Sequence, residues 1–201
     1  MTTVPTIASV VEGHGDVSAL PVLIRGIARS VYGYHHIEVT QPHRVPRGQM
    51  IKSDTLARAV RMQSARVGER GGVLIVADAD DDCAVELAAT FAQSCVPTKP
   101  EIAIAVREFE GWFLASIESL REHRHVRADA TFRSEPEQAR GAKERLSQLM
   151  IEPYRETLHQ ASFASLLNPS LAGRSRSFAH LVGCIGRLLG GEDTGGAAVA
   201  G

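Results

Sequence analysis

Three short apolar segments constrain the fold of this chain most, because each of them runs directly into acidic residues. The segments are 6–11 (TIASVV), 72–77 (GVLIVA) and 101–106 (EIAIAV). Continuous apolar runs of this length are typical of strands that are buried on both faces of a sheet. Between the second and third segments, residues 83–94 carry apolar side chains at helical spacing. This alternation of strand, helix and strand predicts an α/β fold with a central, mainly parallel sheet flanked by helices.

Further elements are expected between the first two of these strands. Residues 16–32 have a helical pattern, and residues 37–40 suggest another strand that leads into a polar, proline-containing loop. Ser53 and Asp54 are suited to cap the next helix, which the glycine pair 71–72 would close.

The C-terminal half is expected to be helical. A helix that begins near Glu108 would bury one face, formed by Phe109, Trp112, Phe113 and Ile117. Ser134 and Glu137 match a capping box, with Pro136 in the first turn, and predict a helix that runs to about Met150. The last two helices are expected at residues 154–167 and 177–189.

Length and composition indicate one domain. A chain of 201 residues with 44% hydrophobic content can fill one core, and a second complete domain would be cramped. We therefore expect a single domain over residues 1–190. The small, glycine-rich segment 191–201 is expected to be a flexible tail.

Charge and cysteine content limit the partners and the location of the protein. With a formal net charge of −1, contacts to nucleic acid would depend on local basic patches. Cys83, Cys95 and Cys184 form no CxxC pair, which argues against a disulfide framework and a structural zinc site. No segment approaches the roughly 20 apolar residues of a membrane span, and we expect a cytoplasmic protein with no membrane partner.

Acidic residues follow all three buried strands. In an open parallel sheet, ligands bind beyond the carboxyl ends of the strands, where the loops converge. A single acid at such a position is often only a solvated loop residue or a helix cap. The whole set predicts a functional site at one edge, and it comprises Glu12, Asp16, Asp78, Asp80, Asp81, Asp82, Glu108 and Glu110.

The chemistry of these side chains favours a hard divalent cation. Alternation in an extended segment would place Asp78, Asp80 and Asp82 on one side, with Asp81 opposite and outside the site. Like charges this close repel one another unless a cation lies between them. Mg²⁺, or Mn²⁺ in its place, binds a few carboxylates and leaves positions for water and substrate phosphate.

The order of the motifs resembles a known family. VEGHGD at 11–16, DADDD at 78–82, EFEGW at 108–112, Lys143 and the pair 177–178 stand in one short chain. This series is similar to that of short uncharacterised bacterial Toprim-like proteins, a domain of unknown function related to nucleases of the OLD (overcoming lysogenization defect) type. The resemblance extends from about residue 7 to 189 and implies a Toprim-like, Rossmann-type fold.

The resemblance also implies roles for the acids. Glu12 would be a general acid/base or a metal ligand, and Asp78 with Asp80 would bind magnesium. Asp16 and Glu110 would be the further acids of a site with two metal ions, where Glu108 could replace Glu110.

Basic side chains are candidates for binding phosphate. Lys143 lies at the edge of an apolar helical stripe, where it could neutralise charge on phosphoryl oxygens or be an ordinary surface lysine. A loop group (Arg44, Arg47 and Lys52) and a second group (Arg174 and Arg176) could hold a nucleic-acid backbone, although solvated surface charge is the commoner reason for such groups.

Two pairs of histidines could suggest metal binding. His35 and His36 are adjacent, and His123 and His125 are separated by one residue, but neither pair has a partner at ligand spacing. We therefore expect both pairs to lie on the surface.

The predicted function is that of a magnesium-dependent phosphodiesterase of the nuclease type, which uses water to cleave DNA or RNA. The resemblance adds an ATPase as a possible partner, in a phage-defence system. The alternative is a scaffold or binding subunit of an ATPase complex, whose Toprim fold holds metal or phosphate without turnover.

Overall fold

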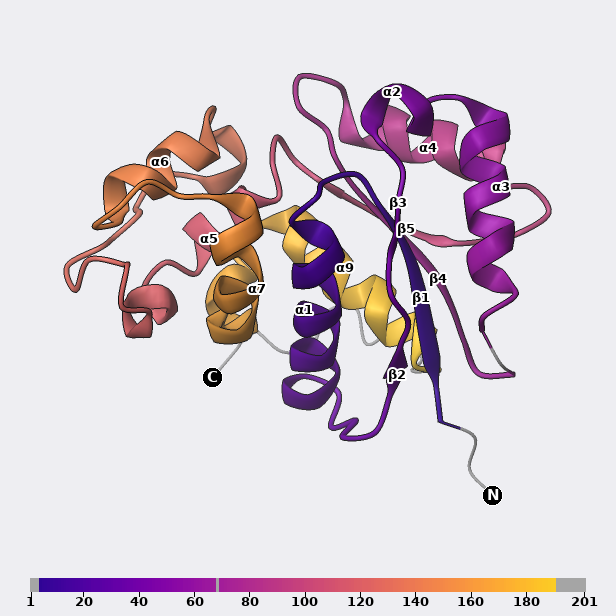
Figure 1. The fold of residues 1–201 in the computed structure, drawn as a ribbon, viewed down its shortest axis with the longest axis horizontal. Helices are drawn as coiled ribbons and strands as arrows, with labels where there is room; N and C mark the ends of the chain where they lie inside the picture. Colours follow the sequence, from indigo (N-terminus) through magenta and orange to yellow (C-terminus); the bar gives the residue numbers. More distant parts are fainter. Residues whose placement is uncertain (1–3, 68, 191–201) are drawn as a thin grey trace.

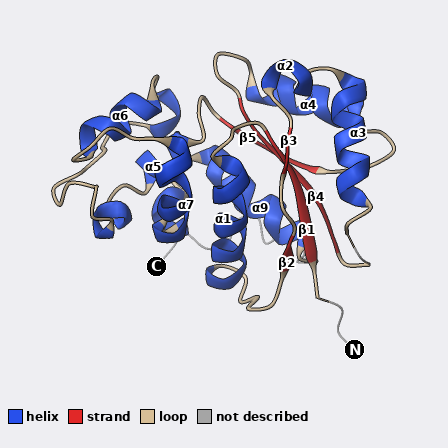
Figure 2. Ribbon diagram, in the orientation of Figure 1, coloured by secondary structure: helices blue, strands red, loops and turns tan. Residues whose placement is uncertain are grey.

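The centre of the fold is a parallel sheet (Figures 1 and 2). The computed structural model describes residues 4–67 and 69–190. Strands β1 (Thr6–Val11), β4 (Gly71–Asp78) and β5 (Glu101–Ala105) lie side by side in this order, and all their pairings are parallel. They correspond to the three apolar segments of the sequence, so the predicted α/β fold with a central parallel sheet is confirmed.

Two very short strands complete the sheet next to β1. β2 (Glu38–Val39) pairs with the beginning of β1, and β3 (His43–Arg44) pairs with its end. β2 lies within the strand expected at 37–40. β3 and the short helix α2 (Arg47–Met50) occupy the segment that was expected to be a loop.

Helices cover both faces of the sheet (Figure 1). One face packs against α3 (Ser53–Ser64) and α4 (Ala84–Ser94), and the other packs against α1 (Asp16–Ser30) and α9 (Arg176–Leu188). Successive residues of β4 alternate between these two apolar clusters, because neighbouring side chains of a strand point to opposite faces. A strand buried on both sides must be apolar throughout, and this explains the pattern GVLIVA.

The remaining helices extend the layer on the α1 side. α7 (Glu156–Leu166) packs alongside α1. α5 (Glu110–Ala115) and α6 (Ala142–Leu149) pack against each other, and α6 lies at the outer end of this layer (Figure 1). Shorter helical segments are η1 (Ser119–Glu122), η2 (Pro136–Gln138) and α8 (Pro169–Ala172). The predicted helical character of the C-terminal half is confirmed. The expected tail at 191–201 lies outside the described residues.

The expected helix from Ser134 to Met150 is wrong in its first half. Only η2 forms there, and α6 begins after Gly141, whose φ of 64° interrupts the helix. The capping box is absent, because Glu137 Oε1 accepts hydrogen bonds from the Ser175 hydroxyl at 2.9 Å and the Ser177 N–H at 2.6 Å. Glu137 thus stabilises the beginning of α9.

Gly71 has a different role from the one expected. It begins β4, whereas the preceding helix α3 already ends at Ser64. Its φ is 115°, and a Cβ at this position would lie 1.9 Å from the carbonyl oxygen of Thr6. Glycine therefore permits the close pairing of β4 with the beginning of β1.

We expect Gly71→Ala to lower the free energy of unfolding by more than about 2 kcal/mol, because the new side chain would combine a left-handed φ with a clash against the backbone. Gly48→Ala is the matched control, since a Cβ there meets nothing within 4 Å. It should raise stability by about 0.5 kcal/mol. Urea unfolding measures both changes, and equal stability of the two variants would contradict the register of β1 and β4.

Candidate functional site

Four carboxylates meet at the carboxyl edge of the sheet. Glu12 follows β1, Asp16 begins α1, Asp78 ends β4 and Glu110 begins α5. We call these four residues the acid cluster. Burial, followed by the negative charges of Asp16, Glu110 and Glu12, raises the pKa of Asp78 well above its ordinary value. The structure thus brings together four of the predicted site residues from the ends of three strands.

Asp16 closes the loop that follows β1. It is buried, its Oδ2 accepts the Gly13 N–H at 2.9 Å, and its Oδ1 accepts Nε2 of Gln160 at 2.8 Å. A Cβ on Gly13 would lie 2.8 Å from Asp16 Oδ2, so the loop needs glycine there. Burial raises the pKa of Asp16, and the two hydrogen bonds only partly oppose this.

Asp78 and Glu110 are fixed by groups from separate elements. Asp78 Oδ1 accepts the Phe109 N–H at 2.8 Å. Glu110 is 1% exposed, and its Oε1 accepts the hydroxyl of Tyr154 at 3.1 Å. Burial raises the pKa of Glu110 to about 7, although the positive charge of Lys143 acts in the opposite direction.

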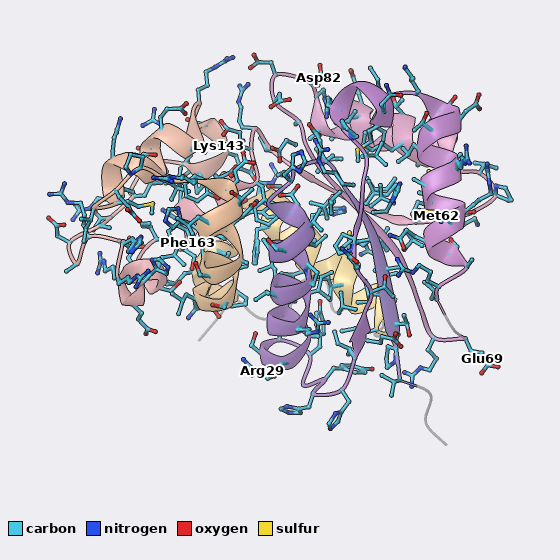
Figure 3. All side chains as sticks on the ribbon, viewed as in Figure 1. Arg29, Met62, Glu69, Asp82, Lys143 and Phe163 are labelled. Atoms are coloured by element: carbon cyan, nitrogen blue, oxygen red, sulfur yellow. The ribbon has the colours of Figure 1, made fainter. Side chains whose placement is uncertain are left out.

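Lys143, labelled in Figure 3 on α6, is the cation that lies beside Glu110 of the acid cluster. Its Nζ lies 4.0 Å from Glu110 Oε2 and 2.5 Å from Oε1 of Glu156. Burial alone would lower the pKa of Lys143, but Glu110, Glu156 and Asp78 together raise it above its ordinary value. This ammonium is therefore held in its charged form beside the carboxylates.

Arg47 is the cation on the other side. Its NH1 lies 3.6 Å from Glu12 Oε2 and donates to the carbonyl of Asp78, and its NH2 pairs with Asp82. Burial raises the pKa of Glu12, and the charge of Arg47 opposes that shift. Among the described residues, no group donates a hydrogen bond to the buried Oε2 of Glu12. The atom has lone pairs available for another cation.

The predicted alternation of the DADDD segment is wrong. Asp80 has a φ of 51° and donates its N–H to the Arg107 carbonyl, and the Asp82 N–H donates to Ala79, so the segment is a tight turn and not an extended strand. Asp80 is exposed, and its charge raises the pKa of Glu12. Asp82 is also exposed (Figure 3). It forms an ion pair with Arg47.

Asp81 points away from the acid cluster. It pairs with Arg107 and, at 2.8 Å, with Arg140.

Glu108 is not in contact with the acid cluster. Its Oε1 accepts the Ala142 N–H at 3.1 Å, at the beginning of α6. Of Glu108 and Glu110, the structure brings Glu110 into contact with Lys143.

The other basic candidates are not in contact with the acid cluster. The guanidinium of Arg174 donates to three backbone carbonyls, those of Leu114, Ala115 and Phe132. Lys52 is exposed immediately before α3, and Arg176 is exposed at the beginning of α9. The structure gives Arg174 a packing role and leaves Lys52 and Arg176 at the surface.

Three contributors to the site were not found from the sequence, and they lie in the first turns of α7 or just before it. Tyr154 contacts Glu110, Glu156 contacts Lys143, and Gln160 contacts Asp16. Their sequence distance from β1 and β4 is large, and the segment carries no motif of its own. Only the packing of α7 alongside α1 brings them to the site.

The acid cluster suits a hard cation better than a soft one. All its ligands are carboxylate oxygens, their pKa values are raised, and one buried oxygen has no hydrogen-bond donor. Within the described ranges, no three carboxylates have ligand atoms that all lie within 4.8 Å of one another. A cation shared by three of these acids would therefore require their side chains to rotate inward.

The fold and the site define an α/β protein with an acidic centre at the carboxyl edge of its parallel sheet. A family model described as "Domain of unknown function (DUF4276)" matches residues 11–185. The chain therefore belongs to this family. Searches of curated proteins and of solved structures found no match. In the described part of the chain, no helix has the length and apolar character that crossing a membrane requires.

The raised pKa of Glu110 predicts how stability depends on pH. Between its unfolded value of 4.5 and its folded value of about 7, the folded chain retains a proton that the unfolded chain releases. The stability contributed by Glu110 is therefore complete below the unfolded pKa and is lost as the pH rises through the folded pKa. Glu110→Gln retains an acceptor for Tyr154 and does not titrate, so it should remove up to about 3 kcal/mol of this pH dependence.

The measurement is urea unfolding of both proteins in EDTA across this pH range. Histidine contributions are common to both proteins and cancel in the difference. Identical pH profiles for wild type and Glu110→Gln would show that Glu110 titrates normally.

Proposed function

We propose that the protein is a magnesium-dependent phosphodiesterase of the nuclease type, with water as the nucleophile and nucleic acid as the substrate. The observation that carries the proposal is the buried acid cluster with a cation on each side, Lys143 and Arg47. Burying several carboxylates together costs stability. A structural role does not require that cost, but a site that receives metal and phosphate does.

Different carboxylates of the acid cluster would bind metal and transfer protons. A bound divalent cation supplies an activated water and neutralises charge on the phosphoryl oxygens. Asp78, Asp16 and Glu110 would hold such ions, with Asp80 at the exposed border. Glu12 is suited to accept a proton from the attacking water, because burial raises its pKa toward neutrality.

The two basic side chains of the site, Lys143 and Arg47, would contact the substrate. Lys143 remains charged and is positioned to stabilise negative charge that develops on phosphoryl oxygens. Arg47 now pairs with Glu12 and Asp82, and its planar guanidinium could exchange one of these carboxylates for a phosphate. Lys52 and Arg176 are more distant candidates for the nucleic-acid backbone.

The Toprim and OLD relationship belongs to this proposal and is supported by the order of the motifs along the chain. An ATPase partner and a cytoplasmic location in a phage-defence system are part of the same proposal. The modest basic charge of the chain is a reason to expect that a partner helps to hold the nucleic acid.

Asp78→Asn should reduce Mg²⁺- or Mn²⁺-dependent cleavage of DNA or RNA by at least about 100-fold, because it removes the carboxylate ligand at the end of β4 that the other three acids surround. The amide oxygen can still accept the Phe109 N–H, so the fold should be retained. Asp80→Ala should also reduce the rate of metal-dependent cleavage.

Asp81→Asn is the matched control, because this acid belongs to the same turn but pairs with Arg107 and Arg140. It should leave the rate within about threefold of wild type. Cleavage is measured on single-stranded and duplex substrates, with and without the candidate ATPase. Metal binding without cleavage above the Asp78→Asn background, in the presence of the partner, would favour the scaffold function.

A further inference from the structure

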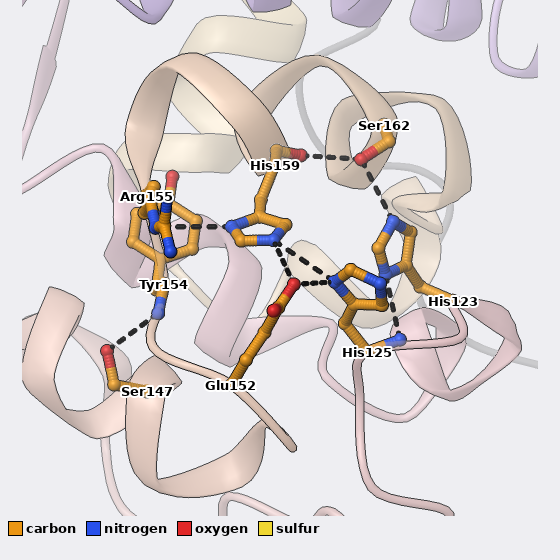
Figure 4. Close-up of polar contacts among 8 residues, drawn as sticks. All are labelled: His123, His125, Ser147, Glu152, Tyr154, Arg155, His159 and Ser162. Atoms are coloured by element: carbon orange, nitrogen blue, oxygen red, sulfur yellow. Dashed lines mark hydrogen bonds and ion pairs between the residues drawn. The ribbon is translucent and has the colours of Figure 1, made fainter.

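A cluster of histidines lies beside the beginning of α7 (Figure 4). Nε2 of His159 is 3.5 Å from Oε1 of Glu152 and 3.4 Å from Nδ1 of His125, and His125 also pairs with Glu152. His123 packs edge-on against both rings. We call these four residues the histidine cluster. The expectation that His123 and His125 lack partners is wrong, because their partners come from α7 and the segment before it.

The three ligand atoms of His125, Glu152 and His159 lie within 4.8 Å of one another, as in a metal site. The hydrogen bonds of His159 argue against a metal. Its Nδ1 accepts the Arg155 N–H at 2.9 Å, so the neutral ring carries its proton on Nε2, the atom that faces Glu152. A histidine that binds metal through Nε2 normally carries its proton on Nδ1 and donates it, which the Arg155 N–H opposes.

The position of His159 connects this cluster to the candidate site. The ring is 1% exposed and is stacked on Tyr154, with centroids 5.8 Å apart and an interplanar angle of 29°. Tyr154 donates to Glu110, and Gln160, the residue next to His159, donates to Asp16. The contacts of His159 therefore determine where the beginning of α7 lies relative to the acid cluster.

We propose that His159 is a positioning residue, whose neutral ring fixes the beginning of α7 against the acid cluster and whose protonation releases it. The neutral ring accepts the Arg155 N–H through Nδ1. The protonated ring carries hydrogen on both nitrogens, so two donors face each other at this position and the hydrogen bond is lost. The consequence for catalysis rests on the proposed function, but the positioning of α7 does not.

The surroundings of His159 determine the direction of the pH effect. The titratable groups that face it are Glu152, His125, His123 and Tyr154. Burial lowers the pKa of His159, Glu152 opposes this shift, and His125 adds to it. The neutral ring is therefore fully populated above the ordinary histidine pKa of about 6.5. The neutral ring is lost as the pH falls through the lowered pKa that His159 has in the folded chain.

Two variants separate the hydrogen bond from the packing of the ring. His159→Asn places an amide oxygen near the position of Nδ1, so it retains an acceptor for the Arg155 N–H and does not titrate. His159→Leu fills similar volume and offers no acceptor. The measurement is hydrogen exchange of the Arg155 amide by NMR, corrected for intrinsic exchange, between about pH 5 and 7.5. Amides of α9 serve as an internal reference.

In wild type, protection of the Arg155 amide should fall at least about tenfold as the pH is lowered. In His159→Asn it should be independent of pH, and in His159→Leu it should be low throughout. If the leucine variant does not fold, His159→Gln replaces it, because its longer side chain cannot place an acceptor at Nδ1.

Three results would overturn the proposal. They are the same pH dependence in wild type and His159→Asn, full protection in the leucine or glutamine variant, and stoichiometric Zn²⁺ binding that His125→Ala abolishes. Wild-type protein that shows the expected exchange but no cleavage at any pH, with the candidate ATPase present, would refute the proposed nuclease function and leave the positioning role intact.

Discussion

The mutual repulsion of buried carboxylates is the constraint on which the rest of this structure depends. Asp78 lies at the end of a strand buried on both faces, and burial, followed by the negative charges of three further acids, raises its pKa. The fold compensates with two cations, Lys143 and Arg47, and with donors from Phe109 and Gln160. These compensating groups come from α6, from α2, from the segment after β5 and from α7. The acid cluster therefore depends on elements from most of the chain.

The beginning of α7 connects the parallel sheet to the helical C-terminal half. Tyr154, Glu156 and Gln160 contact Glu110, Lys143 and Asp16, respectively. The geometry of the acid cluster thus depends on a segment that is remote in sequence from all three strands. His159 in turn fixes that segment through the Arg155 N–H. Under the proposed function, chemistry at the acid cluster would be sensitive to the packing of α7 on α1.

The sequence predicted the elements whose burial leaves a clear apolar pattern along the chain. A strand covered on both faces must be apolar throughout, so β1, β4 and β5 were recognisable, and the acids that follow them could be assigned to one edge. Features controlled by single distant contacts were not predictable. Glu137 bonds to the beginning of α9 instead of capping its own helix, and Asp80 adopts a left-handed turn that pairs with Arg107. β3 has two residues, too few to carry a pattern.

The central claim is that the acid cluster is a divalent-cation site, and anomalous diffraction from crystals soaked in Mn²⁺ tests it most directly. We expect a peak between Asp78, Glu12 and the neighbouring acids Asp16 and Glu110, with Lys143 displaced from Glu110 or retained beside the ion. The peak should be absent from Asp78→Asn crystals grown and soaked in the same way. No peak at these carboxylates in the wild type, at a Mn²⁺ concentration that occupies other sites on the molecule, would contradict the claim.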